Sequence, residues 1–362
     1  MRHRRWLRLL VVGAAIGLVA AACSSSGDGD SADGEEVELT QDGGTLQEVL
    51  DRGHLNCLVN DQLLGFGQID DEGNFSGFDI DYCRAIAAAL FDDPDAVEFT
   101  PVTAEQRFTA LQSGEGDVLI RNTTDTAFRD GVEGVTFMPT TFYDGQGMMV
   151  HEGAYDSIAA MDGATICVLS GTTTELNLTT VATDLGITLT PLTFDDNDTM
   201  TPAFLEGQCD GWTTDKSGLA GLKPGLEEAG SGPLTILDET VSKEPLGPAV
   251  RDGDSEWAQA IRWITFSPVQ AEEFGCTSEN ADTCAGDNPD ILRWIGEPTE
   301  DEADFDSGLG LPADFNLRIL RHLGNYGQIF DRNIGPDTPS GLPRGVNAQW
   351  TDGGLLYAPP YR

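Results

Sequence analysis

Strand-like and helix-like segments alternate along this chain, and the alternation occurs twice. The first run begins with a strand over 54–60 and a helix over 78–91, and the second begins with a strand over 164–169 and a helix over 172–186. In the first of these helices, residues of apolar character recur on one face at Cys83, Ile86, Ala87 and Leu90. Strands that alternate with helices build a largely parallel sheet covered by helices, so each run predicts one α/β unit.

The remaining predicted elements complete the two units. In the first unit they are a helix over 45–52, a strand over 97–101, a helix over 104–113 and a strand over 117–121. In the second unit they are a strand over 188–194, a helix over 199–207 and a strand over 210–214. Two extended segments, 144–150 and 241–251, lead from the first unit to the second and back. Two crossings indicate a second lobe inserted into the first, and we expect one lobe over 45–146 and 246–362 and the other over 147–245.

An export signal precedes this region. Basic residues are followed by an apolar stretch over 9–22 that is short for a membrane-spanning helix, and small residues stand directly before Cys23. This arrangement resembles a bacterial lipoprotein signal, in which the cysteine becomes the lipidated first residue. We therefore expect a signal peptide over 1–22 and a lipidated, disordered tether over 23–44, because the residues after Cys23 are polar and acidic. Ordinary secretion, with cleavage after Ala22 and no role for Cys23, is the alternative.

Cysteine counting favours lipidation of Cys23. The chain has seven cysteines, and an exported chain with an odd number needs an explanation for one of them. If Cys23 carries lipid, an even number remains for disulfides. Many pairings are possible, and the economical one joins sequence neighbours: Cys57–Cys83, Cys167–Cys209 and Cys276–Cys284. No C-x-x-C motif occurs and the four histidines are scattered, so we expect no metal site.

The charge of the chain limits its partners. It has 61 acidic residues against 20 Lys and Arg, and a net charge of −41. A surface of this charge repels nucleic acid and anionic membrane lipids, so we expect neither as a direct binding partner. Such a charge helps to keep a protein soluble, which suits an exported protein.

The stretch RNTTDTAFRD, over 121–130, places scarce arginine beside several hydroxyls. A guanidinium matches a carboxylate, and hydroxyls or backbone N–H groups can complete the coordination of that anion. A simpler explanation makes Thr126 a helix N-cap and Arg129 the partner of Asp125 or Asp130 in a surface ion pair. From the residues of this stretch alone, the simpler explanation is favoured.

Two polar sites follow strands of the second unit. In SGTTTE, over 170–175, Gly171 allows a close turn and the following helix start offers free N–H groups to an anion. A capping box from Thr172 to Glu175 explains the same residues structurally. Asp215 follows another strand and could receive an ammonium group, although it could equally be a plain helix cap. Together with the arginine stretch, these sites are what a zwitterion such as an α-amino acid requires.

Long strings across the chain resemble the extracytoplasmic solute-binding proteins of ABC transporters. The resemblance is to the polar amino acid type, closest to its general L-amino acid-binding members, and it extends from about residue 45 to 362. It is carried by the stretches 108–130, 142–150, 168–178, 207–221, 242–254, 324–339 and 347–360. It implies a periplasmic-binding-protein-like clamshell, in which two α/β lobes joined by a two-segment hinge close on one amino acid.

The resemblance also implies roles for individual residues. Arg129 would pair with the ligand carboxylate, and Thr124 and the backbone at Asn122 would contact the ligand from the same lobe. From the other lobe, Thr173 would bind the carboxylate and Asp215 would take the ammonium group.

Further ligand contacts are implied beside these. Gly171 and Thr172 belong to the same helix start as Thr173. Leu63 and Leu64 stand near the place where relatives of narrower specificity carry an aromatic residue, and an apolar wall there suits broad specificity.

The function implied is capture of L-amino acids and their delivery to the transmembrane permease subunits. We expect no catalysis, no cofactor, and a location in the periplasm or at the outer face of the cell membrane, held by the lipid anchor. An enzyme on the same fold, such as a dehydratase, is one alternative, although the sequence has no GxSxG or HExxH motif. A tethered amino-acid sensor domain is another.

Overall fold

The computed structural model describes residues 44–298 and 307–361. The predicted signal peptide, Cys23 and all of the predicted tether except Gly44 lie outside these residues. Within the described part of the chain, no helix combines the length and the apolar character that a membrane crossing needs.

The first sheet has the strand order β5-β1-β6-β15-β7. Its strands are β1 (Leu55–Val59), β5 (Val97–Pro101), β6 (Val118–Leu119), β7 (Val135–Phe137) and β15 (Ala249–Arg251). β1 pairs in parallel with β5 and β6, as the alternating pattern predicts. β15 pairs antiparallel with both β6 and β7, an edge that the sequence analysis did not predict. These edge strands are too short to show a periodic pattern.

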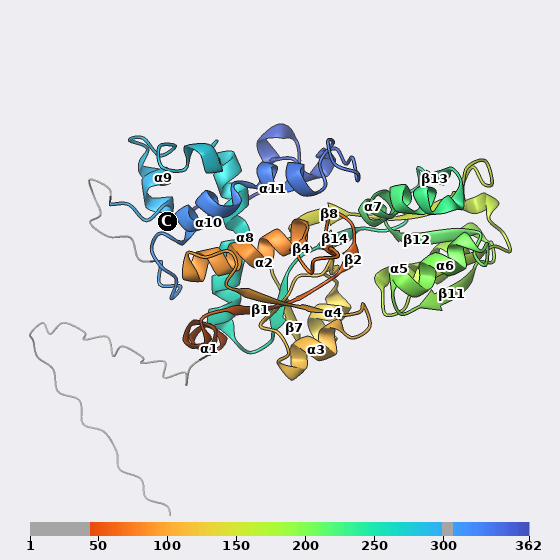
Figure 1. Cartoon of the computed structure of the whole chain (residues 1–362), viewed down its shortest axis with the longest axis horizontal. Helices are drawn as coiled ribbons and strands as arrows, with labels where there is room; N and C mark the ends of the chain where they lie inside the picture. The colour runs from red at the N-terminus through yellow and green to blue at the C-terminus, as the bar shows by residue number, and fades with distance from the viewer. Residues whose placement is uncertain (1–43, 299–306, 362) are drawn as a thin grey trace, which may run out of the picture. The chain divides into compact units, whose positions relative to one another are not determined.

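Helices pack around this first sheet. They include α1 (Thr45–Arg52), α2 (Phe78–Phe91), α3 (Arg107–Ser113), α4 (Ala127–Val132), α8 (Ser255–Glu273), α9 (Pro289–Trp294), α10 (Phe315–Leu323) and α11 (Tyr326–Asn333). A small sheet of β2 (Gln62–Leu63), β3 (Gly67–Ile69) and β4 (Phe75–Ser76) precedes α2. Helix α10 lies along α2 (Figure 1), so a segment late in the chain packs against the first unit. A ring cluster fills the junction, where Phe78 contacts Phe66, Phe142 and Tyr326.

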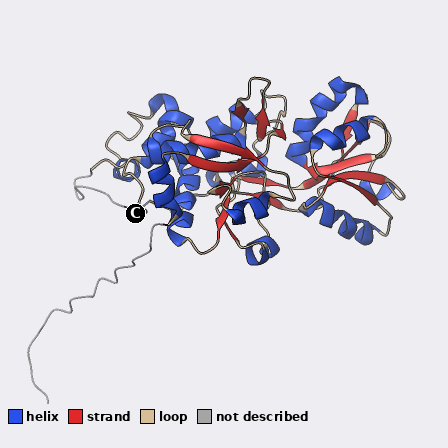
Figure 2. Cartoon of the chain, turned by 60° about the horizontal axis from the view of Figure 1, so that its bottom comes forward, coloured by secondary structure: helices blue, strands red, loops and turns tan. Residues whose placement is uncertain are grey.

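The second sheet has the strand order β11-β10-β12-β9-β13. Its strands are β9 (Gln146–His151), β10 (Thr165–Leu169), β11 (Thr190–Phe194), β12 (Gly211–Asp215) and β13 (Leu234–Ile236). β10 pairs in parallel with β11 and β12, whereas β9 pairs antiparallel with β12 and β13. Helices α5 (Thr173–Leu185), α6 (Asn197–Leu205) and α7 (Lys216–Leu226) flank these strands (Figure 2). The core of this sheet is built around Phe204 and Trp212, which meet edge to face.

The chain passes between the two sheets through a separate pair of strands. β8 (Phe142–Asp144) leads into β9, and β14 (Glu244–Leu246) leads back to β15. The two pair antiparallel, with Glu244 opposite Asp144. Thr124, which follows β6, forms an isolated bridge with Leu246 in the same place. Both crossings expected from the extended segments therefore run side by side.

The predicted elements differ from the observed ones mainly at their ends. The helix predicted over 104–113 begins at Arg107, and the strand predicted over 117–121 has only its middle part in the sheet. The helix predicted over 199–207 begins two residues earlier, because the side chain of Asp196 caps it by accepting a hydrogen bond from the Thr199 N–H.

Candidate functional site

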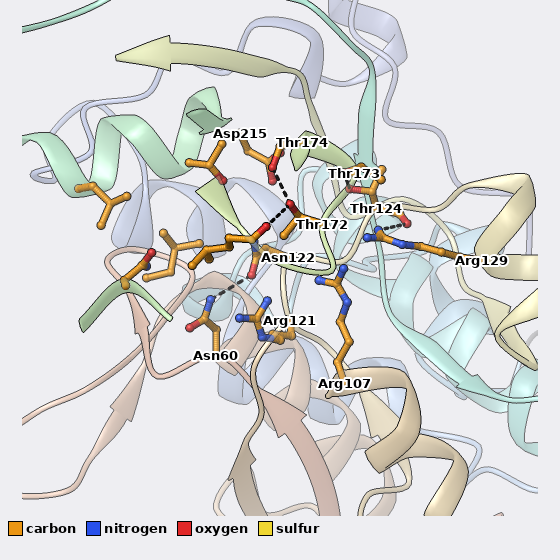
Figure 3. Close-up of a pocket in the computed structure, with 15 residues that line it drawn as sticks. Asn60, Arg107, Arg121, Asn122, Thr124, Arg129, Thr172, Thr173, Thr174 and Asp215 are labelled. Carbon is orange, nitrogen blue, oxygen red and sulfur yellow. Dashed lines mark hydrogen bonds between the residues drawn. The ribbon is translucent and has the colours of Figure 1, made fainter. Parts of the chain in front are cut away.

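A cavity lies where β1, β6, β10 and β12 end at their carboxyl termini. Open α/β sheets bind ligands at such ends. The cavity (Figure 3) brings together most of the residues singled out from the sequence: Leu63, Asn122, Thr124, Arg129, Thr172, Thr173 and Asp215. It does not bring in Gly171 or Leu64. Lining residues that the sequence analysis missed include Asn60, Arg107, Thr174, Asn197 and Leu222.

Arg129 is a buried residue of the cavity wall. The Thr126 hydroxyl accepts a hydrogen bond from the Arg129 N–H, so the predicted N-cap is confirmed. The predicted surface ion pair is wrong, because the side chain of Arg129 points inward. Its Nη1 donates to the carbonyl of Thr124 at 2.8 Å, and its guanidinium lies 5.4 Å from the ring centre of Phe108. In the first turn of α4 only Arg129 is buried, whereas its neighbours Phe128 and Asp130 are exposed.

Two more arginines line the same cavity. Arg121 has a structural contact, since its Nε donates to the Val102 carbonyl at 2.7 Å. It nevertheless reaches the cavity wall. Arg107 extends from the start of α3, and its Nη2 donates to the carbonyl of Gly171 at 3.2 Å. The scarcity of arginine in so acidic a chain is the signal that could have singled out Arg107.

These guanidiniums lie close enough to affect one another. Burial, and then the neighbouring Arg129 and Arg121, lower the pKa of Arg107 well below its ordinary value. Burial lowers the pKa of Arg121 to about 10, although Asp79 and Asp61 oppose this. Acidic groups nearby oppose these shifts, namely Asp215 and Glu133 at Arg107, and Glu244, Asp215 and Glu133 at Arg129, so the cavity brings basic and acidic groups together.

The start of α5 forms the opposite wall. The Thr172 hydroxyl accepts from the Glu175 N–H, as a capping box predicts. The carboxylate of Glu175 reaches back one residue further than expected, to the N–H of Gly171 at 3.1 Å. Because α5 is a helix of 13 residues, its N-terminus adds partial positive charge to this wall.

Gly171 connects the two sides of the cavity rather than lining it. Its φ of +68° lies in the left-handed region, and a Cβ there would come within 2.9 Å of the Cα of Glu105. Glycine is thus needed both for the turn and for the close approach. Leu64 also lies outside the cavity wall, where its carbonyl packs against Gly221.

Asp215 ends β12 and occupies the N-cap position of α7. Its side chain makes no capping hydrogen bond, so the plain-cap explanation is wrong. The residue is buried, and burial raises the pKa of its carboxyl well above the ordinary value. Nearby Asp144 and Glu244 raise this pKa further, whereas Arg129 and Arg107 lower it.

Glu244 is the main feature that the sequence analysis missed. It lies on β14 and is 1% exposed. Its Oε2 accepts hydrogen bonds from the hydroxyls of Thr124 and Thr173, each at 2.7 Å. Its Oε1 accepts from Asn177 and Ser242. Because a threonine hydroxyl has one proton, neither hydroxyl can donate to a ligand carboxylate while it donates to Glu244.

Asn122 has its backbone already engaged. Its φ of +33° is unusual for a residue other than glycine, and its N–H donates to Asp79 at 2.6 Å. Its side-chain oxygen accepts from the amide of Asn60 at 3.1 Å. Burial raises the pKa of Asp79 to about 7, against the lowering effects of this N–H and of Arg121.

A second cavity adjoins the first. It shares Asn60, Arg121, Leu169 and Asn197 with the first cavity. Its other lining residues are mostly polar, among them Thr103 and Gln106. Arg121 therefore stands at the junction of the two spaces.

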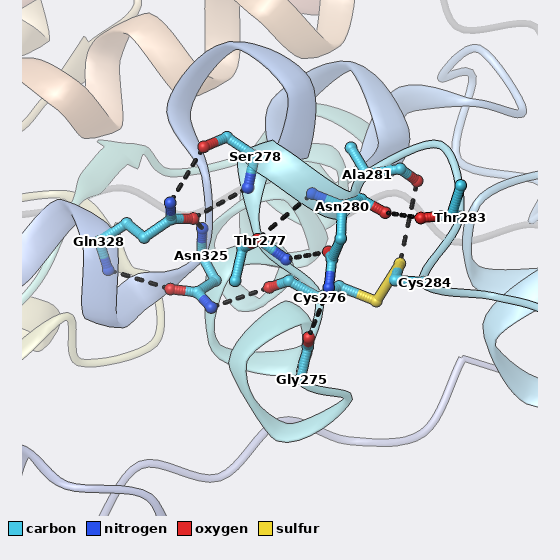
Figure 4. Close-up of a disulfide and its surroundings, with 10 residues drawn as sticks. All are labelled: Gly275, Cys276, Thr277, Ser278, Asn280, Ala281, Thr283, Cys284, Asn325 and Gln328. Carbon is cyan, nitrogen blue, oxygen red and sulfur yellow. Dashed lines mark hydrogen bonds between the residues drawn. A yellow bond between two sulfur atoms is a disulfide. The ribbon is translucent and has the colours of Figure 1, made fainter.

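The structure contains three disulfides in the sequence-neighbour pairing: Cys57–Cys83, Cys167–Cys209 and Cys276–Cys284. The first joins β1 to α2, as the buried face of that helix predicts. The third closes a short loop after α8 (Figure 4), where Asn325 also donates to the carbonyl of Cys276. Among the described residues, no group of His, Cys, Asp or Glu is placed to hold a metal ion.

Comparison with known proteins identifies the family to which this fold belongs. The model of the bacterial extracellular solute-binding proteins, family 3, matches residues 55–299. The chain belongs to this family. The resemblance drawn from the sequence strings is thereby confirmed, and so is the two-lobed α/β fold.

Two relatives and one solved structure are each similar to this chain over 88% of its length. The general L-amino acid-binding periplasmic protein AapJ of Rhizobium johnstonii is 46% identical over 88% of this chain and 93% of its own length. The glutamate/glutamine/aspartate/asparagine-binding protein BztA of Rhodobacter capsulatus is 46% identical over 88% of this chain and 93% of its own length. A solved periplasmic binding protein of an ABC transporter from Brucella ovis, with glutathione bound, has a TM-score of 0.84 and 46% identity. The match covers 88% of this chain and 100% of the Brucella ovis chain.

Proposed function

We propose that this protein binds free L-amino acids outside the cytoplasm and delivers them to the permease subunits of an ABC transporter, without catalysing a reaction. One observation carries the proposal. A buried guanidinium, that of Arg129, and a buried carboxylate, that of Asp215, line the same cavity from different sheets. An α-amino acid carries a carboxylate and an ammonium group. Each of these charges, once removed from water, needs a partner of opposite charge.

The ligand carboxylate would lie between Arg129 and the start of α5. Arg129 uses one of its five donors for the Thr124 carbonyl, and the backbone N–H groups at Thr173 and Thr174 belong to the first turn of α5. The ammonium group would contact Asp215. Thr124 and Thr173 would contribute hydroxyl oxygens as acceptors, because their protons go to Glu244.

Closure would follow from contacts made on both sides. The lobes over 45–146 with 246–362 and over 147–245 would move about β8 and β14, since these strands carry both crossings. A ligand that touches both lobes binds the closed arrangement better than the open one, and so shifts the population toward it.

Broad specificity and membrane anchoring are parts of the same proposal. Leu63 and Leu222 give the cavity a flexible apolar wall, and one relative is named as a general L-amino acid-binding protein. Lipidation of Cys23 after removal of the signal peptide would hold the protein near its permease. The relatives carry the names of binding proteins, which supports a function without catalysis.

A second candidate ligand is a larger amino-acid derivative. The Brucella ovis protein has glutathione bound, and here a second cavity of about 140 Å³ adjoins the first. That space could hold the part of such a ligand beyond its amino-acid end.

Calorimetric titration of the processed protein with the common L-amino acids, their D-enantiomers and glutathione tests the proposal. Several L-amino acids should bind, and Arg129→Gln and Asp215→Asn should each abolish binding while the fold is retained. Arg321→Gln is the control, because Arg321 pairs with Asp282 at the surface. Absence of binding to every ligand would overturn the proposal, and binding of glutathione alone would favour the second candidate.

A further inference from the structure

A further cavity, of about 230 Å³, lies among the end of α8, the start of α9 and the last described residues of the chain. It is separate from the amino-acid cavity, because the two have no lining residue in common. Aromatic rings and acidic side chains form its walls together with one amide, and no described lysine or arginine lines it. These groups are the ones that recognise a cation.

Trp350 and Tyr357 form the aromatic wall. Their rings meet edge to face with their centres 5.7 Å apart. The turn between them requires glycine, because Gly353 has a φ of +85° and a Cβ at Gly354 would overlap the carbonyl of Ala348. Trp350 is 48% exposed and Tyr357 is 58% exposed, so this wall is accessible to a ligand.

Glu273 places negative charge beside these rings. Its Oε2 accepts a hydrogen bond from the Nε1 of Trp350 at 3.2 Å, and it forms no ion pair with a residue that the structure describes. The other carboxylate of the cavity, Asp290, has Arg293 at 3.4 Å, which offsets part of its charge. Glu273 is also the last residue of α8, a helix of 19 residues, and the C-terminus of a helix favours a cation.

Gln270 brings a polar group to the inner part of the cavity. It lines the cavity and is 4% exposed, and its side chain has no hydrogen-bond partner among the described residues. Gln349 is buried to the same extent, but its amide donates to the Val269 carbonyl at 2.9 Å. A buried amide without a partner costs free energy, and its oxygen can accept from an N–H donor. A ligand with such donors would satisfy it.

We propose that this cavity binds a small organic cation that has N–H donors, namely a guanidinium or primary ammonium group on a short apolar stem. The cation would lie against the ring of Trp350, where its attraction to the aromatic face adds to its attraction to Glu273. Its N–H groups would donate to Glu273 and to the amide oxygen of Gln270, and the stem would pack against Tyr357. This site is additional to the amino-acid site of the proposed function.

Butylguanidinium and butylurea test the proposal, because they have nearly the same shape and differ in charge. Neither has the α-carboxylate that an amino acid would present to Arg129. Titration calorimetry of the processed protein at about 150 mM salt, which screens the charge of the surface, should show one butylguanidinium site and a butylurea affinity at least about tenfold lower. Tryptophan fluorescence should change over the same range of ligand concentration. Equal affinities for the two compounds, or no binding of butylguanidinium, would overturn the proposal.

Two variants assign the binding to this cavity. Glu273→Gln and Trp350→Leu should each weaken butylguanidinium binding about three- to tenfold, and Trp350→Leu should also reduce the fluorescence change. Glu228→Gln is the matched control, because it removes one negative charge from an exposed residue that does not line the cavity. Wild-type affinity in both cavity variants would contradict the proposal. An equal loss in the control would show general attraction to an acidic surface instead of a site.

Tetramethylammonium tests the part assigned to Gln270, because it has the charge of the ligand but no N–H donor. Gln270→Leu should reduce the ratio of butylguanidinium to tetramethylammonium affinity, and an unchanged ratio would remove Gln270 from the site. If this variant fails to fold, Glu273→Gln and Trp350→Leu still decide the proposal, because both residues are exposed.

Arg362 provides a last check. It lies outside the described residues and follows Tyr361, which lines the cavity. Arg362→Gln should leave the affinity for butylguanidinium unchanged. An affinity that rises about tenfold or more would mean that the chain's own arginine competes for the cavity as its occupant, and the proposal of a separate ligand would then be wrong.

Discussion

The hydroxyl of Thr173 donates a 2.7 Å hydrogen bond to the carboxylate of Glu244. The first residue of α5 is thereby attached to the crossing strand β14. The same carboxylate oxygen accepts from Thr124, which follows β6 of the other sheet. One buried side chain on a crossing strand thus joins both walls of the cavity, so its replacement should change the affinity for the ligand.

Glu244→Gln should weaken amino-acid binding by about tenfold and lower the melting temperature by several degrees. The amide offers one oxygen in place of two, so some of the four donors around it lose their acceptor, and a hydrogen bond to a charged group contributes about 1.5–3 kcal/mol. Calorimetry and thermal melting of the variant measure both effects. Glu98→Gln is the control, because Glu98 is an exposed residue on β5. Wild-type affinity in Glu244→Gln would show that the carboxylate has no part in binding.

Binding should release protons from the protein. Burial, Asp144 and Glu244 raise the pKa of Asp215 well above its ordinary value in the free protein, although Arg129 and Arg107 lower it. A ligand ammonium favours the ionised carboxylate, so the proton held by Asp215 leaves on binding, and affinity rises with pH until the free protein has lost that proton.

Calorimetry in two buffers of different ionisation enthalpy measures this release. Asp144→Asn separates the contribution of Asp144, whose own pKa burial raises to about 6. A binding enthalpy that is the same in both buffers would contradict proton release. So would an affinity that falls as the pH rises above the ordinary pKa range of an aspartate.

Local patterns predicted a large part of the fold. The helix over 78–91 and the strands before and after it depend on apolar spacing, which a single sequence shows directly. Thr126 and Thr172 were recognised as caps because a cap involves residues only three positions apart. The antiparallel edge of β7 and β15 was missed because its pairing joins residues about 115 positions apart without any local signal.

The site was predicted less completely, for a related reason. Arg129 and Asp215 follow strands, so the rule that ligands bind at strand ends applied to them. Glu244 lies in an extended crossing segment, and its four donors come from separate parts of the chain. Arg107 begins a helix whose sequence resembles an ordinary surface helix, and its burial depends on the approach of Gly171. Such contacts are properties of the tertiary structure.

Gly171→Ala should weaken ligand binding by disturbing the approach of the two walls. A Cβ at this position would come within 2.9 Å of the Cα of Glu105, which is backbone and cannot turn aside. The left-handed φ adds strain of about 1 kcal/mol on its own account. Gly186→Ala is a matched control, because Gly186 has a φ of +66° and open space around its α-carbon.

Titration of both variants with the same amino acid separates the two causes. Gly186→Ala should lower the melting temperature and leave affinity unchanged, whereas Gly171→Ala should lower both. Equal affinities in the two variants would mean that the contact with Glu105 does not limit binding.

Asp79 should make the protein less stable as pH rises from about 4 to about 7. Burial raises the pKa of its carboxyl from 3.8 to about 7 in the folded state. Between these values the folded protein holds a proton that the unfolded chain has lost, so the free energy of unfolding falls with rising pH and then levels off above the folded pKa.

Asp79→Asn keeps an oxygen that can accept from the Asn122 N–H and removes the titration. The variant should match the unmodified protein near pH 4 and exceed its stability near pH 8, by an amount on the order of a few kcal/mol. Urea unfolding of both proteins at matched pH measures the difference, in which the titrations of Asp144 and Asp215 cancel. A difference that stays constant across this range would show that Asp79 ionises in the folded state at the same pH as in the unfolded chain.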